Sequence, residues 1–142
     1  RRCGGMERRT FPRAIGATGT VTLAGCLDSR ASVGDYDVGM STVAFKPETL
    51  TVETGTTVVW RNTSKQGHTI TAYEESLPEG AAFFASGEYD SEAAARDAWA
   101  GSAGGRLAAG DTFEHTFDVP GTYPYFCIPH EQAGMAGTVE VE

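Results

Sequence analysis

The stretch from Thr122 to Glu142 reads TYPYFCIPHEQAGMAGTVEVE. Its first part is aromatic and β-prone, its last part alternates between apolar and polar residues, and both patterns are typical of strands. Between them stand Cys127, His130 and Met135, which offer a thiol, an imidazole and a thioether within nine residues. Because all three groups bind soft metals, the spacing predicts a strand–loop–strand unit whose loop holds a metal ion.

The donor set of this loop lacks one imidazole. A blue copper site has two His and one Cys in a trigonal plane and a weak axial Met. Of the three histidines in the chain, His68 is the best candidate for the missing ligand. His115 lies in a predicted strand and shares a face with Phe113 and Phe117. We therefore predict a buried or half-buried packing role for His115.

Other metal and enzyme chemistries fit the residues less well. One spare histidine is too few for a second, catalytic copper site, and a binuclear copper centre would need a second cysteine in the loop. Met135 is a poor zinc ligand. A Cys127–His130 nucleophile pair is a further alternative, but thiol hydrolases usually take their base from a distant segment. The residues favour one copper ion and no catalytic group.

Strand signals recur along the chain, separated by Gly, Pro and Asn. They cover Ser41–Phe45, Leu50–Glu53, Thr56–Asn62, Thr69–Tyr73, Thr112–Phe117, Thr122–Cys127 and Gly137–Glu142. A segment of about 100 residues is the usual size of a single core, and no internal repeat is visible. The sequence predicts one all-β sandwich domain over residues 38–142.

The connection from Glu74 to Gly110 is longer than a hairpin needs. Its Ser91–Trp99 segment combines strong helix formers with a serine suited to cap a helix, so we predict one short helix there. Phe83, Phe84 and Trp99 are then expected to pin the connection to the sandwich. A docking surface for a partner is the alternative use of this connection.

The N-terminal residues 1–25 predict an export signal. Arg8-Arg9 followed by Thr10-Phe11 resembles a twin-arginine signal, and Met6 is the expected start. The apolar stretch that follows is too short to span a bilayer. The sequence Leu-Ala-Gly before Cys26 resembles a lipobox, which predicts lipidation of Cys26 and a polar tether over residues 26–37. The alternative is an ordinary signal with an incidental cysteine. With Cys3 before the expected start and Cys26 lipidated, only Cys127 remains, so no intramolecular disulfide is expected.

Residues 26–142 are strongly acidic, with six Lys and Arg against eighteen Asp and Glu, a net charge of −12. This charge disfavours nucleic acid and anionic lipid surfaces, keeps a protein soluble and attracts basic partners at low ionic strength. In molar salt the screening length falls to about 3 Å. We therefore interpret most of the acidity as solubility and partner docking as its second role.

In its metal-binding loop and in several of its strands, the chain resembles the plastocyanin-like cupredoxins. It resembles most closely the halocyanins, which are membrane-attached blue copper proteins of salt-loving archaea. The resemblance covers residues 38–142 and rests on four segments: Phe45–Val52, Gly55–Asn62, Gly67–Thr69 and Gly121–Cys127 with its following loop. It implies a Greek-key β-sandwich. The family's copper ligands fall on His68, Cys127, His130 and Met135, with none missing.

The resemblance also implies roles for the neighbours of these ligands. Thr69 stands where plastocyanins and azurins often have an Asn that ties the two ligand loops together, and a hydroxyl can also form hydrogen bonds. The carbonyl of Gly67 is expected to face the copper opposite the Met ligand, as in azurin-like sites. Pro129 offers no backbone donor to the thiolate. Electrons are expected to leave through the edge of His130. If Cys127 faces inward, strand alternation turns Phe126 outward beside the thiolate, which predicts a second, longer route.

The function implied is that of a mononuclear type 1 copper electron carrier, not an enzyme. A protein donor and acceptor, of the kind found in membrane respiratory complexes, would be its partners. The expected location is the extracytoplasmic face of the cell membrane, where the protein is a lipid-anchored peripheral monomer. The alternative function is an extracytoplasmic copper carrier or storage protein.

Overall fold

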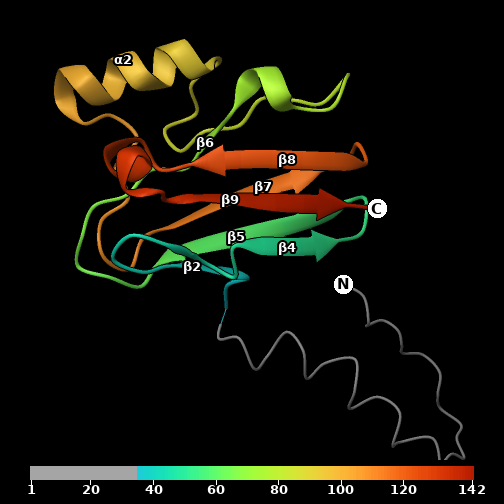
Figure 1. Cartoon of the computed structure of the whole chain (residues 1–142), viewed down its shortest axis with the longest axis horizontal. Helices are drawn as coiled ribbons and strands as arrows, with labels where there is room; N and C mark the ends of the chain where they lie inside the picture. The colour runs from blue at the N-terminus through green and yellow to red at the C-terminus, as the bar shows by residue number, and fades with distance from the viewer. Residues whose placement is uncertain (1–34) are drawn as a thin grey trace, which may run out of the picture. The chain divides into compact units, whose positions relative to one another are not determined.

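The computed structural model of the chain describes residues 35–142. Its strands form two four-stranded sheets, which Figure 1 shows packed as a sandwich. The strands of the first sheet are, in spatial order, β3 (Phe45–Lys46), β2 (Val38–Met40), β5 (Thr56–Asn62) and β7 (Thr112–Phe117). Those of the second are β4 (Thr49–Val52), β9 (Ala136–Val141), β8 (Gly121–Phe126) and β6 (Thr71–Ala72). The predicted all-β sandwich is confirmed.

Both sheets are mixed. In the first, β2 runs parallel to β5 while β5 and β7 are antiparallel. In the second, β4 runs parallel to β9 while β8 pairs antiparallel with both β9 and β6. The sandwich is therefore assembled from strands that are far apart in the sequence, and the two parallel pairs tie its first strands to its later ones.

The core between the sheets is aromatic and centres on Trp60. Along β5 every second residue is inward, and Val58 and Trp60 are fully buried. The Trp60 ring lies 5.4 Å from that of Tyr125 and 6.3 Å from that of Phe117, measured between centroids. Burial of each such large side chain contributes about 1.5–3 kcal/mol. This core supplies a rigid frame for the loops at its end.

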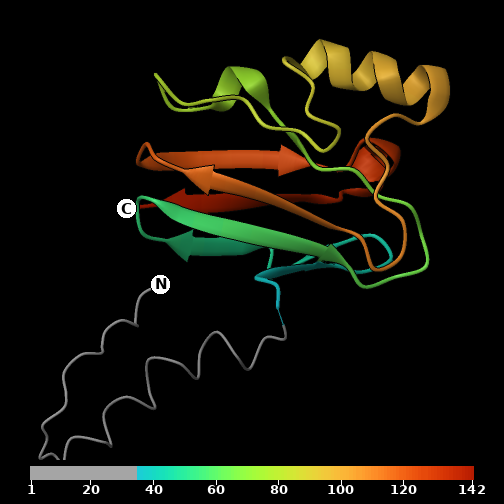
Figure 2. The same ribbon diagram turned by 180° about the vertical axis from the view of Figure 1, so that it is seen from behind.

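The long connection contains the predicted helix. The helix α2 (Glu92–Ser102) begins after Ser91, whose hydroxyl oxygen accepts a hydrogen bond from the Ala94 amide at 3.0 Å. A short 3-10 turn, η2 (Glu74–Ser76), precedes it. Phe84 enters the core and Phe83 packs against it, as expected, whereas Trp99 is half-buried and is not among the side chains packed against that core. In Figures 1 and 2, α2 lies at the same end of the sandwich as the loop between β8 and β9.

The predicted strand at Ser41–Phe45 is wrong. The strand lies earlier, at β2, and residues 41–44 form the turn into β3, where the Ser41 amide donates to the Ala44 carbonyl at 2.8 Å. The Ser41 hydroxyl donates to the same carbonyl. Serine favours such turns because its hydroxyl competes for nearby backbone groups.

The predicted strand at Thr69–Tyr73 shrinks to the two residues of β6. Its neighbours use their amides elsewhere: Thr69 donates to the sulfur of Cys127 and Ile70 donates to the hydroxyl of Ser86. The amides of Thr69 and Ile70 therefore bind the segment that follows β8 and the long connection, and they do not extend the β6 ladder.

Some of the sequence predictions lie outside the described residues. These are the signal segment 1–25, the lipidation of Cys26 and the tether up to residue 34. Within residues 35–142, no helix has both the length and the apolar character that a membrane span requires.

Candidate metal centre

The end of the sandwich that carries the loop between β8 and β9 holds the donors predicted from the sequence. The β8–β9 ladder ends with Phe126 paired to Ala136. Immediately beyond it the Cys127 amide donates to the Met135 carbonyl at 3.1 Å, which closes the loop on itself. The loop between them is the short 3-10 segment η3 (Ile128–Ala133). Both ends of the loop are therefore held by the sheet.

Inside this loop the chain reverses sharply. Gly134 caps η3 in the left-handed region, at φ 90°, which glycine adopts without a steric penalty. The Met135 amide then donates back to the His130 carbonyl at 3.2 Å. This reversal brings Met135 back beside the cysteine from which the loop started, and its side chain is fully buried.

His68 reaches the same place from the loop between β5 and β6. A pair of backbone hydrogen bonds to Leu107 holds it there, His68 amide to Leu107 carbonyl at 3.1 Å and Leu107 amide to His68 carbonyl at 2.7 Å. The His68 side chain is fully buried. The connection that contains α2 therefore returns past the ligand before it enters β7.

The donor atoms of His68, Cys127 and His130 lie within 4.8 Å of one another. The cysteine sulfur is 3.4 Å from Nδ1 of His130 and 3.6 Å from Nδ1 of His68. Two imidazole nitrogens thus point at one sulfur, and Met135 is buried where the loop ends. Two imidazoles, a thiol and a thioether form the donor set that copper prefers, so the residues fit that ion.

Burial shifts the pKa values of two of these donors, Cys127 and His68. It raises the pKa of the Cys127 thiol, with the amides of Thr69 and His130 acting in the opposite direction. It lowers the pKa of His68, and repulsion from His130 lowers it further. An uncharged imidazole is ready to bind metal, whereas the thiol needs the positive charge of an ion to favour its thiolate form.

Thr69 ties the two ligand segments together. Its hydroxyl oxygen accepts a hydrogen bond from the Ile128 amide at 2.8 Å, and its own amide donates to the Cys127 sulfur at 3.4 Å. Thr69 is 1% exposed, so water does not compete for these bonds. The hydroxyl thus provides the tie between loops expected of it.

Two further neighbours named from the sequence lie beside the ligands. Gly67 lies against the side chain of Arg106, and a Cβ at this position would collide with the guanidinium. A side chain on the residue before His68 would therefore displace that arginine. Pro129 stands at the start of η3, a position where its missing amide hydrogen costs the helix nothing.

Phe126 is not at the surface, contrary to the prediction from strand alternation. Its side chain is fully buried. The ring of Tyr73 stacks on it with centroids 4.3 Å apart, and the guanidinium of Arg96 lies 4.4 Å from its centroid. Alternation does turn Phe126 away from the main core cluster, but Tyr73, which follows β6, and Arg96 of α2 cover that face. His130, by contrast, is only partly buried.

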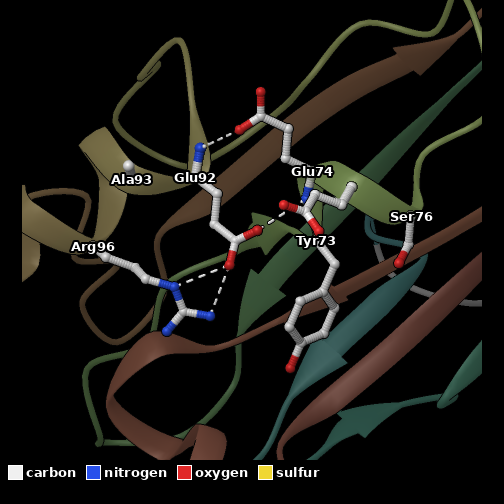
Figure 3. Close-up of a pocket in the computed structure, with 7 residues that line it drawn as sticks. Tyr73, Glu74, Ser76, Glu92, Ala93 and Arg96 are labelled. Atoms are coloured by element: carbon white, nitrogen blue, oxygen red, sulfur yellow. Dashed lines mark hydrogen bonds and ion pairs between the residues drawn. The ribbon is translucent and has the colours of Figure 1, made fainter.

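The cover over Phe126 belongs to a charged cluster that the sequence did not predict. Arg96 donates to Glu92 within α2 at 2.8 Å. It also donates at 2.9 Å to Glu131 of the ligand loop, residues 127–135 between β8 and β9. Tyr73 donates its hydroxyl to the same Glu131 at 2.9 Å. Tyr73, Glu74 and Arg96 line a pocket of about 470 Å³, and Figure 3 shows their side chains around it. The cluster joins α2 to the ligand loop.

A second group that was not predicted from the sequence lies beside His68. The Ser64 hydroxyl lies 3.0 Å from Nε2 of the His68 ring, and Ser64 is itself hydrogen-bonded to the buried Asn62. A signal was present, because Asn and Ser two residues apart are typical of tight turns. That signal predicts a turn, but not which side chain the turn would meet.

Comparisons with known proteins agree with this geometry. The chain matches the family described as copper binding proteins, plastocyanin/azurin family, over residues 33–142. Plastocyanin of Scenedesmus fuscus is 34% identical over 100 residues, which cover 70% of this chain and 88% of the relative. Chloroplastic plastocyanin of Tetradesmus obliquus is 30% identical over 135 residues, covering 94% and 83%.

Solved structures give the same result. An oxidised amicyanin mutant aligns with a TM-score of 0.53 at 26% identity, covering 74% of this chain and 79% of the other. A pseudoazurin from Sinorhizobium meliltoi aligns with a TM-score of 0.52 at 25% identity, covering 74% and 71%.

The sandwich and its His, Cys, His and Met donors define a blue copper protein of the cupredoxin class. The chain belongs to the plastocyanin/azurin family of copper-binding proteins. Its cofactor is one copper ion, and it is an electron carrier and not an enzyme.

Proposed function

We propose that this domain carries single electrons between a protein donor and a protein acceptor at the extracytoplasmic face of a cell membrane. The observation that carries the proposal is the convergence of His68, Cys127 and His130, whose donor atoms lie within 4.8 Å of one another at the end of a rigid sandwich, with the first two fully buried. Bound copper would supply a one-electron couple between Cu(I) and Cu(II). The geometry, the burial and the hydrogen bonds of the site are supplied by the side chains and backbone of the protein.

The role of the chain is to hold its donors in one arrangement. Three donors lie on a loop closed by backbone hydrogen bonds, and the fourth is pinned to Leu107. Thr69 links the two segments. A site that moves little when its charge changes requires little reorganisation, which favours fast electron exchange.

We propose the edge of His130 as the route by which electrons leave. This ring is the partly buried one of the two imidazoles, whereas His68 is fully buried. The second route through Phe126 would have to continue through the ring of Tyr73, which stacks on it at 4.3 Å. The His130 route is the shorter because it begins on a ligand.

Membrane attachment is part of the proposal. The lipobox-like sequence before Cys26 supports a lipid anchor, and the twin-arginine pair supports export. A monomer on a short tether would meet membrane-associated partners such as respiratory complexes. Expression of the full chain in a host that exports and lipidates proteins tests this: the wild type should partition into detergent, and Cys26→Ala should stay in the aqueous phase.

A copper carrier or storage protein would use the same metal without shuttling electrons. Such proteins usually exchange ligands readily, and the buried, tied donors argue against it. Repeated cycles of ascorbate reduction and ferricyanide oxidation in the presence of a copper chelator separate the two functions. An electron carrier keeps its copper and its spectrum over many cycles. Transfer of copper to the chelator on the first reduction would favour the function of a copper carrier or storage protein.

A further inference from the structure

We propose that Ser64 is a positioning residue that holds the imidazole of His68 in the tautomer with the proton on Nε2. This rests on the proposed function in that His68 is taken to be a copper ligand. The Ser64 hydroxyl oxygen lies 3.0 Å from Nε2 of His68. The direction of that hydrogen bond follows from the groups behind it.

The first of these groups is the side-chain amide of Asn62. Its nitrogen donates to the Gln66 carbonyl at 2.6 Å and to the Leu107 carbonyl at 2.9 Å. Both partners can only accept, so the nitrogen and oxygen of this amide cannot be exchanged. Its oxygen therefore faces Ser64, where it accepts from the backbone amide at 2.9 Å.

The second group is the Ser64 hydroxyl, which has one proton to donate. The oxygen of Asn62 lies 2.8 Å from the hydroxyl and takes that proton. The Gln66 carbonyl lies farther away, at 3.4 Å, and could also only accept it. With its proton directed there, the hydroxyl can meet His68 only as an acceptor. The Nε2 atom of His68 must then carry the hydrogen.

The consequence lies on the other side of the ring. A neutral imidazole with its proton on Nε2 has a free lone pair on Nδ1. That Nδ1 is the atom 3.6 Å from the Cys127 sulfur. Asn62 is 1% exposed, so solvent does not compete for its oxygen. The chain from Asn62 through Ser64 thus presents the correct nitrogen to the metal before the metal arrives.

Hydrogen bonds of this kind also raise the basicity of the bound ring, and their loss typically weakens metal binding 10–100-fold. A backbone hydrogen bond with Ser41 also acts on His68, in the direction that raises the pKa of the ring. Ser41 is therefore the competing explanation for the orientation of the ring. If Ser41 alone orients the ring, removal of the Ser64 hydroxyl leaves the tautomer of His68 unchanged.

The test reads the tautomer in metal-free protein labelled with ¹⁵N-histidine, by long-range proton–nitrogen NMR at about pH 8, above the ordinary histidine pKa of about 6.5. Wild type should show His68 with its proton on Nε2 alone. Ser64→Ala should show a mixture of tautomers. Ser64→Thr keeps a hydroxyl and should restore the wild-type pattern. Ser102→Ala is the matched control, because Ser102 is an exposed residue at the end of α2.

Copper retention is measured on the same four proteins by chelator competition. Ser64→Ala should hold copper about 10–100-fold more weakly, and Ser64→Thr should be close to wild type. A wild-type ring with its proton on Nδ1 would overturn the proposal, as would a Ser64→Ala protein with the wild-type tautomer, whatever its copper affinity. Because the tautomer is read without metal, this outcome is independent of whether the copper-loaded protein carries electrons.

Discussion

At the scale of single residues, the site combines a thiol that resists ionisation with a buried imidazole, His68, that favours its neutral form. Burial raises the pKa of Cys127 and lowers that of His68. Both shifts keep charge out of the metal-free site, which would otherwise hold an unpaired ion in the protein interior. Copper binding is therefore expected to supply the charge that the buried thiolate needs.

His115 is the histidine that does not join the site, and its packing prediction is confirmed. It is half-buried, and its ring stacks on Phe84 with centroids 4.6 Å apart. Burial lowers its pKa, although nearby Asp118 opposes the shift. The folded protein thus favours the neutral ring more strongly than the unfolded chain does.

This shift predicts a dependence of stability on pH. The contribution of neutral His115 is fully present above the unfolded pKa of about 6.5 and is lost as pH falls toward the lower folded value. Thermal midpoints of copper-loaded wild type and His115→Leu should be compared between about pH 8 and pH 5. The wild type should lose more of its midpoint on acidification than the variant. Parallel curves for the two proteins would contradict the assignment.

The ligands and the loop tie through Thr69 could be predicted from the sequence, whereas the supporting roles of Ser64 and Arg96 could not. Cys127, His130 and Met135 combine rare donor chemistry with close spacing, so few alternatives compete. Ser64 and Arg96 are common surface residue types, and their roles depend on which segment folds beside them. Phe126 shows the same limit, since alternation gave its direction but not the cover that lies over it.

At the scale of elements, α2 and the ligand loop are joined by the Arg96–Glu131 ion pair. The side chains are 39% and 31% exposed. The pKa of Glu131 is lowered, chiefly by Arg96, and that of Tyr73 is raised to about 12, chiefly by burial. The helix therefore has a structural task at the metal centre in addition to covering Phe126.

A double-mutant cycle with Arg96→Gln and Glu131→Gln measures this link. Because both side chains are partly solvated, we expect a coupling free energy of about 0.5–1 kcal/mol in urea unfolding, decreasing in high salt. A parallel cycle of Arg96→Gln with Glu53→Gln is the control. Glu53 lies in the turn between β4 and β5 and should show additive effects. Equal coupling in both cycles would mean that the ion pair does not join the two elements.

The elements themselves differ in how far the sequence predicts them. The strands β5 and β7 have the predicted bounds, Thr56–Asn62 and Thr112–Phe117. Long alternating runs of residues fit only one kind of element, a strand. Ser41–Phe45 failed because a serine turn interrupts a short apolar run. The pairing of β2 with β5 and of β4 with β9 is a tertiary property that no local pattern contains.

At the scale of the whole molecule, the dominant feature is the net charge of −12 on residues 26–142. Like charges on a compact surface repel one another and destabilise the folded state. At 1 M salt the screening length is about 3 Å, against about 10 Å at 0.1 M. The thermal midpoint of the protein should therefore rise between low salt and molar sodium chloride, as calorimetry can measure. A midpoint that falls over this range would contradict a stability limited by self-repulsion.

Cys127, His68, His130 and Met135 together are expected to form a type 1 copper site. The most direct measurement is the visible absorption spectrum of the Cu(II)-loaded protein, with Cys127→Ser as the control. We predict an intense thiolate-to-copper band in the wild type that disappears on reduction by ascorbate, and no such band in the variant. A wild-type protein that binds Cu(II) without this band, or a variant that keeps it, would contradict the claim.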